Sequence, residues 1–153
     1  DAIVHRHGRS MAARMSELEA TMAGRPWREQ VLAVIDMQVD RLRESPAYVA
    51  VGVARELSPQ ARLEDDEDVE VFTRRLRDRL RDGEALTDSP SLLARCRVAV
   101  QATDALLSLA FRLDRRGDDQ TVAEAKRILM LYLDSVVAEA RTSAEDRARQ
   151  RGA

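Results

Sequence analysis

Cysteine is nearly absent from this 153-residue chain, in which Cys96 is the only one. A single cysteine cannot form an internal disulfide, which agrees with a reducing compartment, and we expect a cytoplasmic protein. Long apolar runs are also lacking, because charged residues interrupt every one of them. No stretch has the basic, then apolar, then small residues that make up a signal peptide. The sequence therefore predicts neither a membrane-spanning helix nor a membrane partner.

An excess of charge of either sign is missing as well. The chain has 25 basic and 27 acidic residues, and arginines alternate with aspartates and glutamates throughout. Phosphate binding needs a concentrated positive field, so these residues are not expected to contact DNA directly. With 44% hydrophobic and 34% charged residues, the composition fits one globular domain with a sizeable core.

Glycine and proline occur at only a few positions, and between them the apolar residues recur at spacings of three and four. This pattern predicts an all-α fold of about six helices. The expected helices cover about Ala2–Ala23, a stretch from Trp27, Pro46–Leu57, a stretch from within ARLEDDEDVEVFTRRL to Gly83, Pro90 to about Arg116, and Asp119 or Thr121 to about Ala144. Residues 1–144 would form the helical domain, and the polar residues 145–153 a disordered tail.

The last expected helix contains RILMLYLDSVV, Arg127–Val137, whose apolar side chains cover most of its circumference. The helix before it has a similarly wide apolar arc. A small monomer cannot bury two such helices completely, so we expect a second copy of the chain to cover them. The predicted contacts of this two-fold dimer are Leu106, Leu109, Ile128, Leu131 and Tyr132.

The whole pattern resembles the C-terminal, ligand-binding and dimerisation domain of tetracycline-repressor (TetR) family transcriptional regulators. The similarity lies in WREQVLAVIDMQVDRLRESPAYVAVGVAREL with its Ser-Pro corner, the charged helix and glycine-containing loop after it, and the two long apolar helices. It covers about Ala2–Arg141. The resemblance implies a sensor for a small effector, and a dimer in which the last two helices pack against their symmetry mates as a four-helix bundle.

The N-terminal helix-turn-helix domain of that family has no counterpart in this sequence, which begins at Asp1 rather than at methionine. We expect a fragment whose first helix would link a missing DNA-binding domain to the ligand-binding domain. DNA would then be contacted only through that domain.

Motifs that could carry metal or catalytic chemistry have simpler explanations. His5 and His7 point about 200° apart on a helix and cannot share one metal ion. The acidic run from Glu64 to Asp68 lacks the spacing and glycine of a calcium loop and fits a solvated helix start. Cys96 has the context of a small buried residue. We expect no catalytic residue, no metal site and no cofactor.

A ligand pocket is suggested by methionines and by polar residues on otherwise apolar faces. Asp104 and Gln101 lie at the border of such a face and fit either a pocket or a solvent-exposed surface. The predicted lining is Met11, Met15, Trp27, Gln38, Tyr48, Phe72, Cys96 and Thr103. Few aromatics and little concentrated charge indicate a mainly apolar, uncharged or weakly polar effector. The alternative is a helical dimeric scaffold or protein-interaction module, in which the methionines fill a solid core and no small ligand binds.

Overall fold

The computed structural model describes residues 13–44 and 59–152, with the backbone alone for residues 59–65. Every regular element in these ranges is an α-helix, which confirms the predicted all-α fold. The helices are a segment over residues 13–21, α2 (Trp27–Glu44), α4 (Pro59–Glu84), α5 (Pro90–Leu113) and α6 (Asp119–Arg151). The helix expected over Pro46–Leu57 lies outside the described residues.

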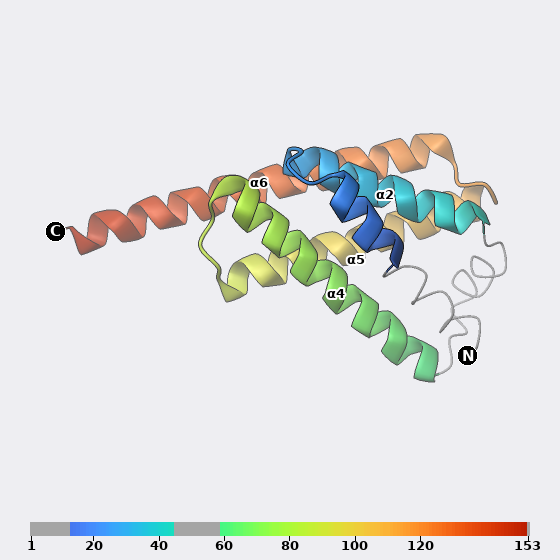
Figure 1. Ribbon diagram of the computed structural model, residues 1–153, viewed down its shortest axis with the longest axis horizontal. Helices are drawn as coiled ribbons and strands as arrows, with labels where there is room; N and C mark the ends of the chain where they lie inside the picture. Colours follow the sequence, from blue (N-terminus) through green and yellow to red (C-terminus); the bar gives the residue numbers. More distant parts are fainter. Residues whose placement is uncertain (1–12, 45–58, 153) are drawn as a thin grey trace.

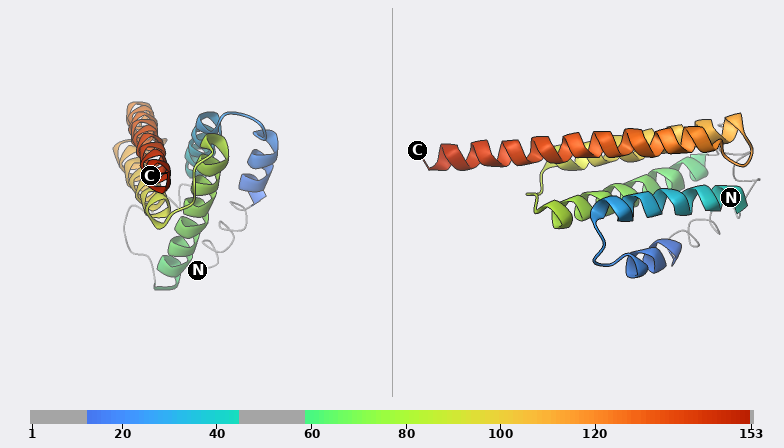
Figure 2. Two further views of the ribbon diagram at one scale, coloured as in Figure 1. Left: turned by 90° about the vertical axis from the view of Figure 1, so that its left-hand side faces the viewer. Right: turned by 90° about the horizontal axis from the view of Figure 1, so that it is seen from above.

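The helices form three layers, best seen end-on in the left view of Figure 2. α5 and α6 lie side by side in one outer layer, and α2 and α4 form the middle layer. The segment over residues 13–21 packs on the opposite side of α2 and α4. α6 extends well beyond the body of the domain toward the C-terminus (Figure 1).

α5 begins where Ser89-Pro90 predicted it. The Ser89 hydroxyl accepts a hydrogen bond from the Leu92 amide at 3.1 Å, and Pro90 occupies the first turn, where no intrahelical N–H bond is lost. Proline also starts α4, whose first residue is Pro59. The sequence had placed the start of this helix within ARLEDDEDVEVFTRRL, which begins two residues later.

The α5–α6 turn requires its glycine. Gly117 has a φ of +80°, and a Cβ there would lie 2.9 Å from the Phe111 ring, so both backbone conformation and packing exclude a side chain. The Asp118 carboxylate then caps α6 by accepting hydrogen bonds from the amide and hydroxyl of Thr121 at 2.8 and 2.6 Å. These bonds lower the pKa of Asp118 below its ordinary value.

Gly83 has a different role from the helix stop that the sequence suggested. α4 continues to Glu84, and the left-handed residue that follows is Ala85, with a φ of 52°. A Cβ on Gly83 would lie 2.9 Å from Cδ1 of Trp27, whose side chain is buried. Gly83 is therefore needed for the close approach of α4 to the start of α2.

α6 is longer than expected, since it runs past Ala144 to Arg151. Arg141 still pairs with Glu84 of α4, but residues 142–151 are all exposed, so tertiary packing does not hold this last part. Alanine, glutamate, arginine and glutamine favour helix here, and Arg149 pairs with Glu145 and Asp146 one turn earlier.

The core lies between the two thicker layers. Leu80, Leu107 and Leu133 are at most 1% exposed and come from α4, α5 and α6 respectively. Cys96 is also fully buried, which confirms its interpretation as a small core residue. The face of each helix in this core follows the three- and four-residue apolar spacing of the sequence.

Candidate functional site

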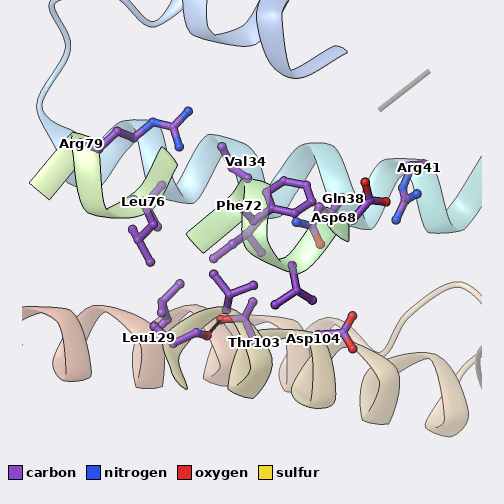
Figure 3. Close-up of a pocket in the computed structure, with 15 residues that line it drawn as sticks. Val34, Gln38, Arg41, Asp68, Phe72, Leu76, Arg79, Thr103, Asp104 and Leu129 are labelled. Carbon is purple, nitrogen blue, oxygen red and sulfur yellow. Dashed lines mark hydrogen bonds between the residues drawn. The ribbon is translucent and has the colours of Figure 1, made fainter. Parts of the chain in front are cut away.

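A cavity of about 100 Å³ lies between α2, α4 and α5, with one residue of α6 at its edge (Figure 3). One water needs only about 10–15 Å³ of such volume, so a small organic molecule is a reasonable occupant. The apolar part of the lining consists of Val31, Val34, Ile35, Val69, Phe72, Leu76, Ala99, Val100 and Leu129. The polar part consists of Gln38, Arg41, Asp68, Arg79, Thr103 and Asp104.

Helical periodicity explains why these residues meet. Each helix contributes side chains spaced three or four apart, which therefore lie on one face. The α2 face contains Val31, Ile35 and Gln38, the α4 face Val69, Phe72 and Leu76, and the α5 face Ala99 and Thr103. Three such faces converge on the space that remains open.

Gln38 and Thr103 provide polar groups near the middle of the cavity. The Gln38 amide extends from α2 toward α5 (Figure 3), and no hydrogen-bond partner for it occurs among the residues that the structure describes. The Thr103 hydroxyl donates to the backbone carbonyl of Ala99 at 2.8 Å. Gln38 is thus able to donate and accept a ligand hydrogen bond, whereas Thr103 is left with acceptor capacity alone.

The charged side chains of the lining lie at the two ends of the cavity. Arg79 lies beside Leu76 at one end, whereas Asp68 and Asp104 lie with Arg41 at the other (Figure 3). The side chain of Arg79 is only 12% exposed. Burial lowers the pKa of its guanidinium, which Glu19 partly offsets.

The structure brings three of the eight predicted ligand residues together. Gln38, Phe72 and Thr103 line the cavity, from α2, α4 and α5 respectively. Met11 and Tyr48 lie outside the described residues. The lining does not include Met15, Trp27 or Cys96.

Those three residues are buried at other places. Met15 belongs to the segment over residues 13–21 and is 2% exposed. Trp27 donates a hydrogen bond from Nε1 to Oε1 of Glu84 at 2.5 Å and carries Arg28 over its ring. Cys96 is enclosed in the core, and this burial raises the pKa of its thiol to about 12.

Sequence reasoning also missed several cavity residues. Arg79 and Asp68 stand in a charged stretch of α4 that looks like a solvated helix face. Their position could have been inferred only from their spacing relative to Phe72 and Leu76, which places all four near one side of α4. Asp104 was left at the border of a face, and it does line the cavity.

The five residues predicted to form a dimer contact lie on α5 and α6. Ile128 and Leu131 are 46% and 62% exposed, and Leu109 is also exposed. Leu106 and Tyr132 are partly buried, and Tyr132 packs against the core. The outer layer therefore has several large apolar side chains exposed among the described residues.

Residues 25–143 match the family described as tetracyclin repressor-like, C-terminal domain. This match covers most of the chain. The chain belongs to this family. Tetracyclin repressor-like C-terminal domains are regulatory rather than enzymatic, and generally bind small effectors and dimerise. No curated protein and no solved structure is significantly similar to this chain.

The described ranges of this tetracyclin repressor-like domain are 13–44 and 59–152. Within them, no group of three or more histidine, cysteine, aspartate or glutamate side chains is placed to hold a metal ion. No helix in the same ranges is both long and apolar enough to cross a membrane.

Proposed function

We propose that this chain is the effector-sensing and dimerisation domain of a transcriptional repressor. DNA would be contacted by a separate domain, and a small, mainly apolar effector would modulate that contact. The observation that carries the proposal is the cavity of about 100 Å³ between three helices, with a largely apolar lining and a few polar side chains. Effector sites in proteins commonly have this composition.

The position of the cavity suits a sensor because its walls belong to different layers. α2 and α4 form one wall, and α5 of the outer layer forms the other. An effector filling the space would favour the relative position of these layers that fits it best. Such differential affinity is the means by which a ligand shifts a conformational equilibrium.

A binding experiment tests the sensing part of the proposal. 1-Octanol and related small apolar compounds should raise the melting temperature of the domain in proportion to their affinity. At about a hundredfold excess over Kd, one site adds about 2.7 kcal/mol to the free energy of unfolding. If no apolar or amphipathic compound binds or shifts the melting temperature, the alternative of a helical scaffold without a ligand is favoured.

The dimerisation part of the proposal is supported by where large apolar side chains are exposed. Among the described residues they are Val98, Leu109 and Leu113 on α5, Ile128 and Leu131 on α6, and Val71 on α4. Five of these six belong to the outer layer. A patch spread along two adjacent helices is typical of a protein interface, and a two-fold axis would bury the same patch on both copies.

Sedimentation velocity with two matched variants tests this interface. Ile128 and Val71 are equally exposed at 46%, but only Ile128 belongs to the α5–α6 layer. We expect Ile128→Glu to sediment as a monomer and Val71→Glu to remain a dimer. A dimer that survives Ile128→Glu and Leu131→Glu would place the interface elsewhere.

A further inference from the structure

Arg79 connects the cavity to the segment over residues 13–21. It lines the end of the cavity beside Leu76, and its Nη2 donates to Oε1 of Glu19 at 2.7 Å. Its Nε donates to Oε1 of Gln30 at 3.3 Å. The described residues offer no partner to Nη1, so the guanidinium retains donors for a further acceptor.

Within the described part of the chain, two arginines share one carboxylate around this guanidinium. Oε1 of Glu19 accepts from both Arg79 and Arg75, at 2.7 and 3.3 Å. Among the described residues, the charged neighbours that act on Arg79 are this one carboxylate and the second arginine, which oppose each other. Two guanidinium groups thus share a single carboxylate at a place where Arg79 is largely withdrawn from water. A second anionic group would stabilise the cluster.

The remaining lining fixes the direction in which an anionic ligand would lie. The central walls are apolar, with Phe72 and Leu76 on α4 and Leu129 on α6. Asp68 and Asp104 lie at the far end together with Arg41. An anionic group is therefore favoured at Arg79, where the guanidinium is largely buried and retains donors for a further acceptor.

We propose that the effector is an amphipathic organic monoacid, whose carboxylate binds Arg79 while its apolar body lies along Phe72, Leu76 and Leu129. This inference rests on the proposed effector-sensing function and deepens it. It differs from the sequence-based expectation of an uncharged or weakly polar effector, because Arg79 lines the cavity. Arginine suits this role, since its planar fork matches a carboxylate.

The same geometry makes Glu19 a competitor of the ligand. The effector carboxylate and the Glu19 carboxylate would share one guanidinium, so each weakens the attraction of the other. Removing the charge of Glu19 should therefore strengthen binding of an organic acid. A purely structural role of the Glu19–Arg79 pair predicts the opposite, because losing the pair would only loosen the site.

The experiment compares octanoate, 1-octanol and octylamine by titration calorimetry against the 153-residue chain. These probes share one alkyl chain and differ in the charge of the head group. We expect octanoate to bind most tightly and octylamine most weakly. Arg79→Gln should weaken octanoate binding by about tenfold, as expected for losing a hydrogen-bonded charged partner, and leave 1-octanol binding unchanged. Arg79→Lys, which keeps the charge, should restore part of the loss.

Two further variants separate the site from general charge effects. Arg74→Gln removes the same charge from an exposed position on α4, where the arginine pairs with Glu70, and should not change octanoate affinity. Glu19→Gln should raise octanoate affinity by about two- to fivefold, the range of a partly exposed ion pair. Folding of each variant is checked by its thermal unfolding transition.

The outcomes distinguish this inference from the proposed function. If 1-octanol binds as tightly as octanoate and Arg79→Gln affects neither, the cavity binds ligands but the acid assignment is wrong. If Glu19→Gln weakens octanoate binding, the competition argument is wrong as well. If none of the three probes binds, the proposed effector-sensing function fails together with the inference.

Discussion

Replacing Ala99 with leucine tests whether the cavity is open in solution. Ala99 is 1% exposed and lines the cavity from α5, so a longer side chain there would extend into the open space. Leucine and alanine have similar helix propensities, and the change therefore reports on packing rather than on the helix itself. In a close-packed core, the same enlargement would be destabilising.

The size of the effect follows from the carbons that are added. Leucine brings three more carbons than alanine, and each buried methylene contributes about 0.8 kcal/mol. Complete burial without strain would stabilise the domain by about 2 kcal/mol. For a domain of this size, this corresponds to a rise in melting temperature of about 4–8 °C. The variant should also lose octanoate and 1-octanol binding, because the added side chain occupies their place.

Ala110 provides a matched control on the same helix. It is fully buried in the core and does not line the cavity, so Ala110→Leu should cost about 1–3 kcal/mol through overpacking. Urea unfolding of both variants measures the two free energies. If Ala99→Leu is as destabilising as Ala110→Leu and leaves ligand binding intact, the space is closed in solution and the cavity argument is refuted.

Three other predictions concern the scaffold around the site. Gly83→Ala should destabilise the domain by about 1–2 kcal/mol, because the added Cβ would lie 2.9 Å from the buried Trp27 ring. In a Trp27→Ala background the same change should be stabilising, because the higher helix propensity of alanine is then the main effect. Urea unfolding measures both free energies. Cys96, with its pKa raised to about 12 by burial, should react with a thiol reagent at about pH 8 at least a hundredfold more slowly in the folded than in the urea-unfolded chain. The pKa of Asp118 is lowered in the folded state, so its contribution to stability is complete above the unfolded-state pKa and disappears as the pH falls through the folded-state pKa. The difference in melting temperature between wild type and Asp118→Ala should shrink over that pH interval. A difference that stays constant would mean that the charge of the cap does not contribute.

Local signals in the sequence were sufficient for most helix boundaries. The predicted start of α5 at Pro90 is confirmed, and its predicted end at about Arg116 lies close to the observed end at Leu113, because Ser89, Pro90 and Gly117 act through their own backbone and immediate neighbours. Gly83 was misinterpreted because its reason is a tertiary contact. Nothing in the residues around it indicates that an indole 56 positions earlier packs against the same turn.

The cavity was only partly predictable, for a related physical reason. Apolar spacing indicates which side of a helix turns inward, and on this basis Gln38, Phe72 and Thr103 were placed in a shared interior. It does not indicate which part of that interior is filled. Cys96 and Thr103 are seven residues apart on the same side of α5, yet one is enclosed by core side chains and the other borders the open space.

α5 connects the two proposed activities because its opposite faces take part in different contacts. Ala99 and Thr103 face the cavity, whereas Val98 and Leu109 are exposed on the outer layer where a second copy would pack. A helix transmits displacement along its whole length as a nearly rigid body, so a ligand that moves the inner face must also move the outer one. We infer that effector binding and dimer geometry are coupled through α5. By linkage, an effector that changes the dimerisation constant must have its own affinity changed by the same factor on dimerisation.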